Sequence, residues 1–174
     1  DFDILKWYTQ VVSNQATEIQ LQALANQKNI AGLVALSKFY LMQGDYTQAQ
    51  SNLDLVKIKL KSHILIPLIQ TDIYLGQNKF DQAYDSISSL QKTMPENRAL
   101  SYKLAEVLIG QGKIDQAQTL VQRFIRKNQR DIEGWQLLQQ ATNLDKSSPL
   151  QAVNMLCYRA EAEYWSGYEE NAIK

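Results

Sequence analysis

The chain has 174 residues, and its 18 basic and 18 acidic side chains give a formal net charge of zero. A neutral balance creates no overall field that would concentrate nucleic acid or an anionic membrane surface. A single cysteine, Cys157, excludes an internal disulfide framework and any multi-cysteine metal site. The apolar run at residues 64–69 contains Pro67 and is far shorter than the about 20 residues that a membrane-spanning helix needs.

Residues 1–29 predict a degenerate pair of short helices. The first twelve positions carry apolar side chains at helical spacing. Ser13 and Asn14 can cap a second helix, because both residue types accept backbone hydrogen bonds at a helix start. We expect the packed face of that second helix to carry Ile19, Ala23 and Leu24.

The next three segments, 30–63, 64–97 and 98–131, align without gaps at a spacing of 34 residues. In each segment a small residue is followed four positions later by a large apolar one, and residues four apart share one helix face. These pairs are Ala49 with Leu53, Ala83 with Ile87, and Ala117 with Val121. We therefore expect each alanine at a close crossing of two helices, and we expect the polar Gln91 on the surface.

A turn residue stands five positions before each of these alanines, namely Gly44, Asn78 or Gly112. Glycine and asparagine adopt the left-handed backbone conformation that ends many helices. The stretches before Gly44 and Gly112 follow the spacing of an amphipathic helix. Each 34-residue segment therefore predicts two helices, and no alternating apolar pattern predicts a strand of useful length.

Residues 132–167 predict an irregular fourth repeat. Its first helix carries apolar residues at helical spacing, and its turn has one residue more than the other turns. We expect one long second helix from Pro149 to Trp165, because proline is favoured at the first helical position. Within that helix, Ala152 and Leu156 are expected to form the pair of small and large residues.

Residues 168–174 predict the opening turns of a further helix and the start of a truncated fifth repeat. The sequence begins with Asp1-Phe2-Asp3, without a starting Met or the basic and apolar regions of a signal peptide. We therefore expect this sequence to be an excised part of a longer protein.

The repeated residues resemble the tetratricopeptide repeat (TPR) family, in which a 34-residue helix–turn–helix unit recurs. The residues that carry the resemblance are Tyr40, Gly44, Tyr46 and Ala49; Tyr74, Asn78, Phe80, Ala83 and Pro95; and Leu104, Ala105, Gly112 and Ala117. The family's first-helix tryptophan is missing from all three units. The resemblance implies an all-α fold, a right-handed superhelical solenoid of antiparallel helix pairs, as a single domain over residues 1–174.

In the TPR family, the first helix of each repeat lines a concave groove that binds protein or peptide segments. Mapped onto this sequence, the candidate protein-binding residues are Val34, Lys38, Leu41, Leu68, Asp72, Leu75, Tyr102, Glu106 and Ile109. Tyr102 is the largest of them that we expect to be exposed. Packing between helices is the alternative role for these positions, and the sequence leaves both roles open. The Lys, Asn and Arg residues with which some TPR co-chaperones grip acidic tails are absent here.

No residue pattern in the chain predicts catalysis. His63 is the only histidine, which excludes histidine-based metal sites and triads, and we expect it to be an ordinary residue between repeats. Cys157 has no histidine or CxxC partner nearby and is expected to pack in the interior. The basic stretch at residues 123–130 falls at a helix C-terminus, where cations interact favourably with the helix dipole. We therefore expect no catalytic residue, metal site or cofactor, and neither nucleic acid nor membrane among the partners.

A closer resemblance rests on residues 97–106, 112–117, 134–138 and 159–173. These stretches look like the C-terminal TPR half of periplasmic zinc metalloproteases of the BepA type. That resemblance implies a periplasmic location and a zinc metallopeptidase domain upstream of Asp1. It also implies a non-catalytic role for this chain in outer-membrane protein assembly and quality control, with the protease domain and the assembly machinery as partners.

A stand-alone TPR scaffold is the alternative, for example a pilus-assembly factor or a co-chaperone with no attached enzyme. An H-E-x-x-H helix in the upstream sequence would favour the protease parent, whereas a signal peptide or lipobox alone would favour the scaffold. The sequence leaves open the identity of the partner, the oligomeric state and the face that binds.

Overall fold

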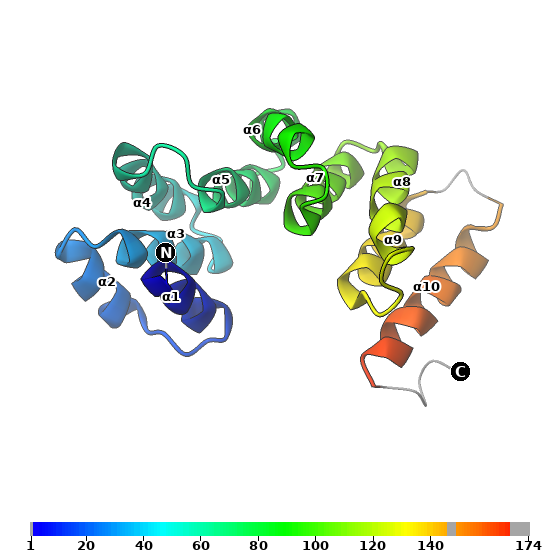
Figure 1. Cartoon of the computed structure of the whole chain (residues 1–174), viewed down its shortest axis with the longest axis horizontal. Coiled ribbons are helices and arrows are strands. Elements are labelled where there is room, and N and C mark those ends of the chain that lie inside the picture. Colours follow the sequence, from blue (N-terminus) through cyan, green and yellow to red (C-terminus); the bar gives the residue numbers. More distant parts are fainter. Residues whose placement is uncertain (1, 146–148, 168–174) are drawn as a thin grey trace. The chain divides into compact units, whose positions relative to one another are not determined.

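The computed structural model of the chain describes residues 2–145 and 149–167. Within this part, all regular secondary structure is helical, which confirms the expected all-α fold (Figure 1). The helices are α1 (Phe2–Val12), α2 (Glu18–Asn26), α3 (Ile30–Met42), α4 (Tyr46–Lys59), α5 (Leu65–Gly76), α6 (Phe80–Thr93), α7 (Arg98–Gly110), α8 (Ile114–Ile125), α9 (Ile132–Leu144) and α10 (Gln151–Trp165). None of these described helices is long and apolar enough to cross a membrane. The chain divides into two compact units, residues 1–86 and 87–174, and the division falls inside α6.

In the first unit, α3 is the central helix. It packs against α1, α2, α4 and α5. Every residue from Ala31 to Ser37 is buried, as expected for a helix whose apolar residues surround its axis instead of forming one stripe. One cluster of buried residues in this unit contains Ile4, Ala31, Leu33, Val34, Ala49, Leu53, Val56, Ile69 and Ile73. A second cluster of Val11, Leu21, Ala35 and Leu36 packs α1 and α2 against α3.

In the second unit, α8 packs against α7 and α9, and α10 packs against α9. Helix α7 also contacts α9 directly, so that α7, α8 and α9 all contact one another. The ring of Tyr102 on α7 meets the ring of Phe124 on α8 edge to face, with 5.6 Å between the ring centroids. Such pairs add to the hydrophobic stabilisation that burial of the rings already provides.

The three alanines expected at helix crossings are completely buried. Ala49, Ala83 and Ala117 each expose 0% of their surface, and their partners Leu53, Ile87 and Val121 expose at most 1%. Ser37 on α3 donates a 2.7 Å hydrogen bond to the carbonyl oxygen of Ala49 on α4. The absence of a larger side chain at Ala49 permits this direct approach of one helix to the backbone of the next. The close crossing is therefore confirmed at Ala49, and the burial of Ala83 and Ala117 agrees with the expectation for the other two.

The expected turn residues have left-handed backbones. Gly44, Asn78 and Gly112 have φ values of 78°, 57° and 73°. Their backbone amides bond to carbonyls in the last turn of the preceding helix, as helix-ending residues do. These turns therefore end α3, α5 and α7 at matching positions of the three 34-residue segments.

A second feature with the same period escaped the sequence analysis. Asn29, Asn97 and Asp131 each accept a backbone hydrogen bond at the start of α3, α7 and α9. At the corresponding place before α5 stands His63, whose Nδ1 accepts a 3.3 Å hydrogen bond from the Leu65 amide. Asparagine and aspartate are among the best residues for this role. Side-chain acceptors therefore recur every 34 residues, directly before α3, α7 and α9 and two residues before α5.

The prediction for the second helix was wrong in its start and in its packed face. Thr17 caps α2 and forms a reciprocal capping box with Gln20. Asn14 instead lies after the end of α1 with a φ of 58°, because asparagine tolerates the left-handed conformation. Ile19 is 79% exposed and Ala23 is exposed as well, whereas Leu24 is half-buried as expected and Leu21 is fully buried.

The prediction for the fourth repeat was correct for the end of its long helix and wrong for its start and its packing. Helix α10 begins at Gln151, two residues after Pro149. Leu156 is 50% exposed and Ala152 is also exposed, whereas Ala162 is buried. The face of α10 that packs is therefore the one that carries Ala162, and not the predicted one. The predicted fifth repeat at residues 168–174 lies outside the described residues.

Gln91 was also placed wrongly. It is only 8% exposed, and its amide donates a 3.3 Å hydrogen bond to the Ser101 hydroxyl. A polar side chain can occupy the interior when a buried partner satisfies it.

Candidate protein-binding surface

Two of the predicted binding residues form an ion pair between neighbouring first helices. Lys38 on α3 and Asp72 on α5 stand 34 residues apart, and Nζ lies 3.4 Å from Oδ2. Both side chains are largely shielded, with 17% and 16% of their surface exposed. The Lys38 ammonium also lies 5.7 Å from the centre of the Tyr8 ring on α1. Repeat periodicity thus brings the two charges together, and a cation–π contact helps to hold the lysine.

Three of the predicted leucines lie on the same helix faces as Lys38 and Asp72. Leu41 lies three residues after Lys38, and Leu68 and Leu75 lie four residues before and three residues after Asp72. All three are half-buried. We call these five residues, Lys38, Leu41, Leu68, Asp72 and Leu75, the Lys38–Asp72 surface. Val34, the remaining candidate of this unit, is 2% exposed and belongs to the core.

In the second unit, the expected exposure of Tyr102 is wrong. Tyr102 exposes 1% of its surface and Ile109 exposes 4%. Burial follows from the packing of α7 against both α8 and α9, which covers more of the helix than sequence position reveals. Glu106 stays partly exposed and pairs with Lys103, with 2.5 Å between Oε2 and Nζ.

Tyr102 belongs to a polar network that joins the starts of α7 and α9. Its hydroxyl donates a 2.8 Å hydrogen bond to Oδ2 of Asp131. Arg98 donates two further bonds to the same carboxylate, at 2.7 and 2.6 Å, and its guanidinium stacks 4.5 Å from the Tyr102 ring centre. Asp131 also accepts from the Gly134 amide at 3.1 Å as the cap of α9. Gly134 lacks a side chain where the Tyr102 hydroxyl would collide with one.

This network shifts the titration of its acidic members. Burial of Asp131 favours the neutral carboxyl, but the hydrogen bonds from Arg98, Tyr102 and the Gly134 amide outweigh burial and hold the pKa of Asp131 below its ordinary value. Burial and the hydrogen bond to Asp131 raise the pKa of Tyr102. Both groups thus keep their ordinary charge at neutral pH, which indicates a structural network instead of a proton-transfer site.

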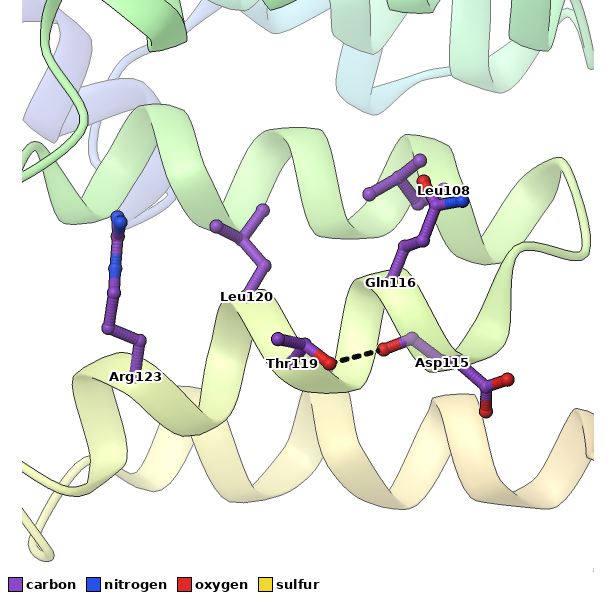
Figure 2. A pocket seen from close by; sticks show the side chains of 6 residues that line it. All are labelled: Leu108, Asp115, Gln116, Thr119, Leu120 and Arg123. Carbon is purple, nitrogen blue, oxygen red and sulfur yellow. Dashed lines mark hydrogen bonds between the residues drawn. The ribbon is translucent and has the colours of Figure 1, made fainter.

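An open pocket of about 450 Å³ lies against α7 and α8. Figure 2 shows Leu120, Gln116 and Arg123 reaching from α8 toward α7, while the Asp115 carboxylate points away. The other lining residues are Leu108 and Thr119. Thr119 donates its hydroxyl to the Asp115 carbonyl oxygen at 2.8 Å. The sequence analysis considered only first helices for binding and so missed this second-helix surface.

The basic stretch at residues 123–130 has partners within the chain. Arg123 donates to the Pro95 carbonyl oxygen, and Lys127 pairs with Glu96. The Arg130 guanidinium lies 5.4 Å from the centre of a Trp165 ring. Three basic residues of this stretch, Arg123, Lys127 and Arg130, therefore contact other segments of the second unit.

Cys157 is exposed, so the expectation of interior packing was wrong. It lies on the side of α10 that does not face α9. Within residues 2–145 and 149–167, no three His, Cys, Asp or Glu side chains gather closely enough to hold a metal ion.

The comparison with family models agrees with the repeat geometry. Residues 74–141 match the model described as tetratricopeptide repeat. This stretch runs from the end of α5 into α9 and contains the buried Ala83 and Ala117 with the turns at Asn78 and Gly112. A search of curated proteins finds no match to the chain. This segment is thus similar to tetratricopeptide repeats, a class of helical repeat that generally mediates protein–protein interaction.

Proposed function

We propose that the chain is a protein-binding module and that an extended or helical protein segment docks on the Lys38–Asp72 surface. The observation that carries this proposal is the placement of half-buried leucines beside an ion pair on two neighbouring first helices. At such a surface, apolar side chains supply most of the binding free energy, whereas charges orient the partner and speed its association.

The surface is well prepared for binding because its charged side chains are already held in place. Lys38 is fixed by Asp72 and by the Tyr8 ring. The helix that carries Lys38 is buried over its first half. Binding would therefore immobilise few additional rotamers, which lowers the entropic cost of association.

We infer further that the parent protein is a periplasmic zinc metalloprotease or chaperone of the BepA type. This inference rests on the sequence resemblance at residues 97–106 and 159–173. Unfolded outer-membrane proteins and the parent's own protease domain are then the natural ligands of the surface. A stand-alone scaffold shares the same repeat features, and an upstream H-E-x-x-H helix separates the two proposals.

The docking surface can be tested with a fluorescent peptide taken from an unfolded outer-membrane β-barrel protein. We expect Leu75→Ala to weaken binding by about 1 to 2 kcal/mol, roughly tenfold, as loss of a central apolar contact does. Leu55→Ala is the matched control, because Leu55 is 49% exposed on the second helix α4. Fluorescence anisotropy measures both affinities, and circular dichroism checks that each variant stays folded.

Equal affinities for Leu75→Ala and the wild type would refute this assignment of the surface. If Leu55→Ala alone weakened binding, the partner would use the second helices. If the peptide failed to bind the wild-type chain at all, the outer-membrane ligand class would be wrong.

A further inference from the structure

Helix α4 carries two large apolar side chains on its outward face. Leu55 is 49% exposed and Ile58 is 74% exposed. They stand three residues apart and so share one face of the helix. The buried residues of α4, Ala49, Leu53 and Val56, lie on the opposite face. Leu55 and Ile58 therefore contribute little to the packing of the first unit.

The repeat does not require apolar residues at these two positions. One repeat length later stand Ser89 and Lys92, and two repeat lengths later stand Arg123 and Arg126. Both equivalent pairs are polar, so the apolar pair of α4 is a departure from the other two regular repeats. Exposed apolar side chains indicate an interaction site when they form a patch with a polar rim.

Three exposed lysines lie at the same end of α4. Lys59 is the last residue of α4, Lys61 follows it, and Lys28 stands before α3. The Lys59 ammonium donates to the Lys28 carbonyl oxygen, which brings these two residues together. Among the residues that the structure describes, no carboxylate pairs with any of the three. The nearby Asp54 pairs with Lys57 instead, with 3.0 Å between Oδ1 and Nζ.

A later repeat has an ion pair at the place of two of these lysines. Two repeat lengths after Lys59 and Lys28 stand Lys127 and Glu96, whose side chains pair. Lys28 thus puts a second cation where the later repeat has the neutralising carboxylate. Like charges repel at close range, and a bound anion relieves that repulsion. We call Lys28, Leu55, Ile58, Lys59 and Lys61 the basic patch.

We propose that the basic patch binds the surface of an anionic phospholipid membrane, with Leu55 and Ile58 entering among the acyl chains and the lysines meeting lipid phosphates. Lysines near a membrane supply electrostatic attraction, and inserted aliphatic side chains add hydrophobic binding. This contact is peripheral and needs no membrane-spanning helix. The expectation that excluded a membrane partner rested on the total charge of zero. At physiological salt, however, charges farther away than about 8 Å are largely screened, so the local charge decides.

The exposure of the apolar pair favours a membrane over an acidic peptide as the partner. An isoleucine that is 74% exposed projects from its helix instead of lining a groove. Peptide segments and small ligands bind mainly in grooves and pockets that enclose their side chains. A lipid interface, by contrast, itself encloses side chains that project from the protein. The proposal is independent of the Lys38–Asp72 surface, and Leu55 remains a valid control in the peptide assay, which contains no lipid.

Co-sedimentation of the full chain with phospholipid vesicles tests the proposal. The vesicles contain phosphatidylcholine alone or phosphatidylcholine mixed with anionic phosphatidylglycerol. We expect the chain to bind the anionic vesicles and not the neutral ones, and we expect added salt to weaken binding. Lys28→Glu supplies the carboxylate that Glu96 supplies to Lys127, and it should lower the affinity about tenfold or more. Ile58→Ser should lower the affinity about fivefold by removing an inserted side chain.

Each variant has a matched control. Lys92→Glu makes the same change of charge at an exposed position of α6, and Ile19→Ser removes an isoleucine that is 79% exposed on α2. We expect both controls to bind as the wild type does, and circular dichroism checks that all four variants stay folded.

Unchanged affinity in Lys28→Glu would overturn the proposal, and so would equal binding of the wild type to neutral and anionic vesicles. Equal losses in the variants and their controls would show that the attraction is not confined to the patch. If the wild type bound soluble polyglutamate but not the vesicles, the partner would be an acidic protein segment and the membrane assignment would be wrong.

Discussion

Asp131 serves both as a helix cap and as the acceptor of an ion-pair network. The same carboxylate accepts hydrogen bonds from the Gly134 amide, Arg98 and Tyr102. It exposes only 5% of its surface, whereas Arg98 keeps 44% of its side chain exposed. A buried carboxylate of this kind is tolerated because its acceptor sites are satisfied. The residue thereby couples the start of α9 to the start of α7.

The network predicts a pH-dependent contribution to stability. The pKa of Asp131 is lower in the folded chain than the ordinary value of about 3.9 expected when unfolded. Its contribution is therefore fully present above about pH 5 and is lost as the pH falls through the folded pKa. We expect Asp131→Asn to lower the free energy of unfolding at pH 7 by about 1 to 3 kcal/mol, and the difference from wild type to shrink below about pH 4.

Urea unfolding at a series of pH values measures this difference. Glu133→Gln is the control, because Glu133 also pairs with Arg98 but keeps 54% of its side chain exposed. An exposed ion pair contributes at most about 1 kcal/mol. A constant difference between wild type and Asp131→Asn from pH 7 to pH 3 would contradict the assigned role.

Among the helices, the crossings at Ala49, Ala83 and Ala117 set how closely each pair packs. These positions were predictable because a small residue at a fixed period leaves a clear signal in one sequence. The left-handed turns at Gly44 and Asn78 were predictable for the same reason, since few residue types adopt that conformation. The turns of the regular repeats and the burial of their crossing residues therefore follow from local chemistry and spacing.

Helices outside the regular period were less predictable. Ser13 is at least as good a cap as Thr17 by residue type, and the signal that separates them is Gln20, which stands three residues after Thr17 and completes a capping box. The burial of Tyr102 depends on α8 and α9, which its neighbours in sequence do not specify. For the same reason, only part of the candidate surface was predictable: Lys38 and Asp72 meet because of the period, whereas Val34 and Ile109 are enclosed by tertiary packing.

The close crossings predict that introducing a leucine affects stability very differently at two adjacent positions of one helix. We expect Ala83→Leu to lower the free energy of unfolding by about 1 to 3 kcal/mol, because Ala83 is completely buried and a larger side chain there would overpack the interior. Gln82→Leu adds a leucine one position earlier on an exposed site and should change stability by less than about 0.5 kcal/mol. Urea melts of both variants test this, and equal effects would show that the crossing is not tightly packed.

For the whole chain, stability is distributed over neighbouring helices. In repeat proteins each repeat contacts mainly the next repeat, so that the stability is approximately a sum of local contributions. The described contacts follow this rule within each unit: α3 with α4, α4 with α5, α7 with α8 and α8 with α9. Local opening is therefore expected to remain near the site of a destabilising change.

This locality predicts a pattern of amide hydrogen exchange. In Asp131→Asn, we expect amides of α7 and α9 to exchange faster by about tenfold for each 1.4 kcal/mol lost, because the network joins the starts of these two helices. Amides of α3, whose partners are α1, α2, α4 and α5, should keep their wild-type rates. Ala49→Leu is the reciprocal variant and should accelerate exchange in α3 and α4 while leaving α9 unchanged. Equal acceleration of α3 and α9 by either variant would mean that the chain opens as one cooperative body, and the local account of its stability would be wrong.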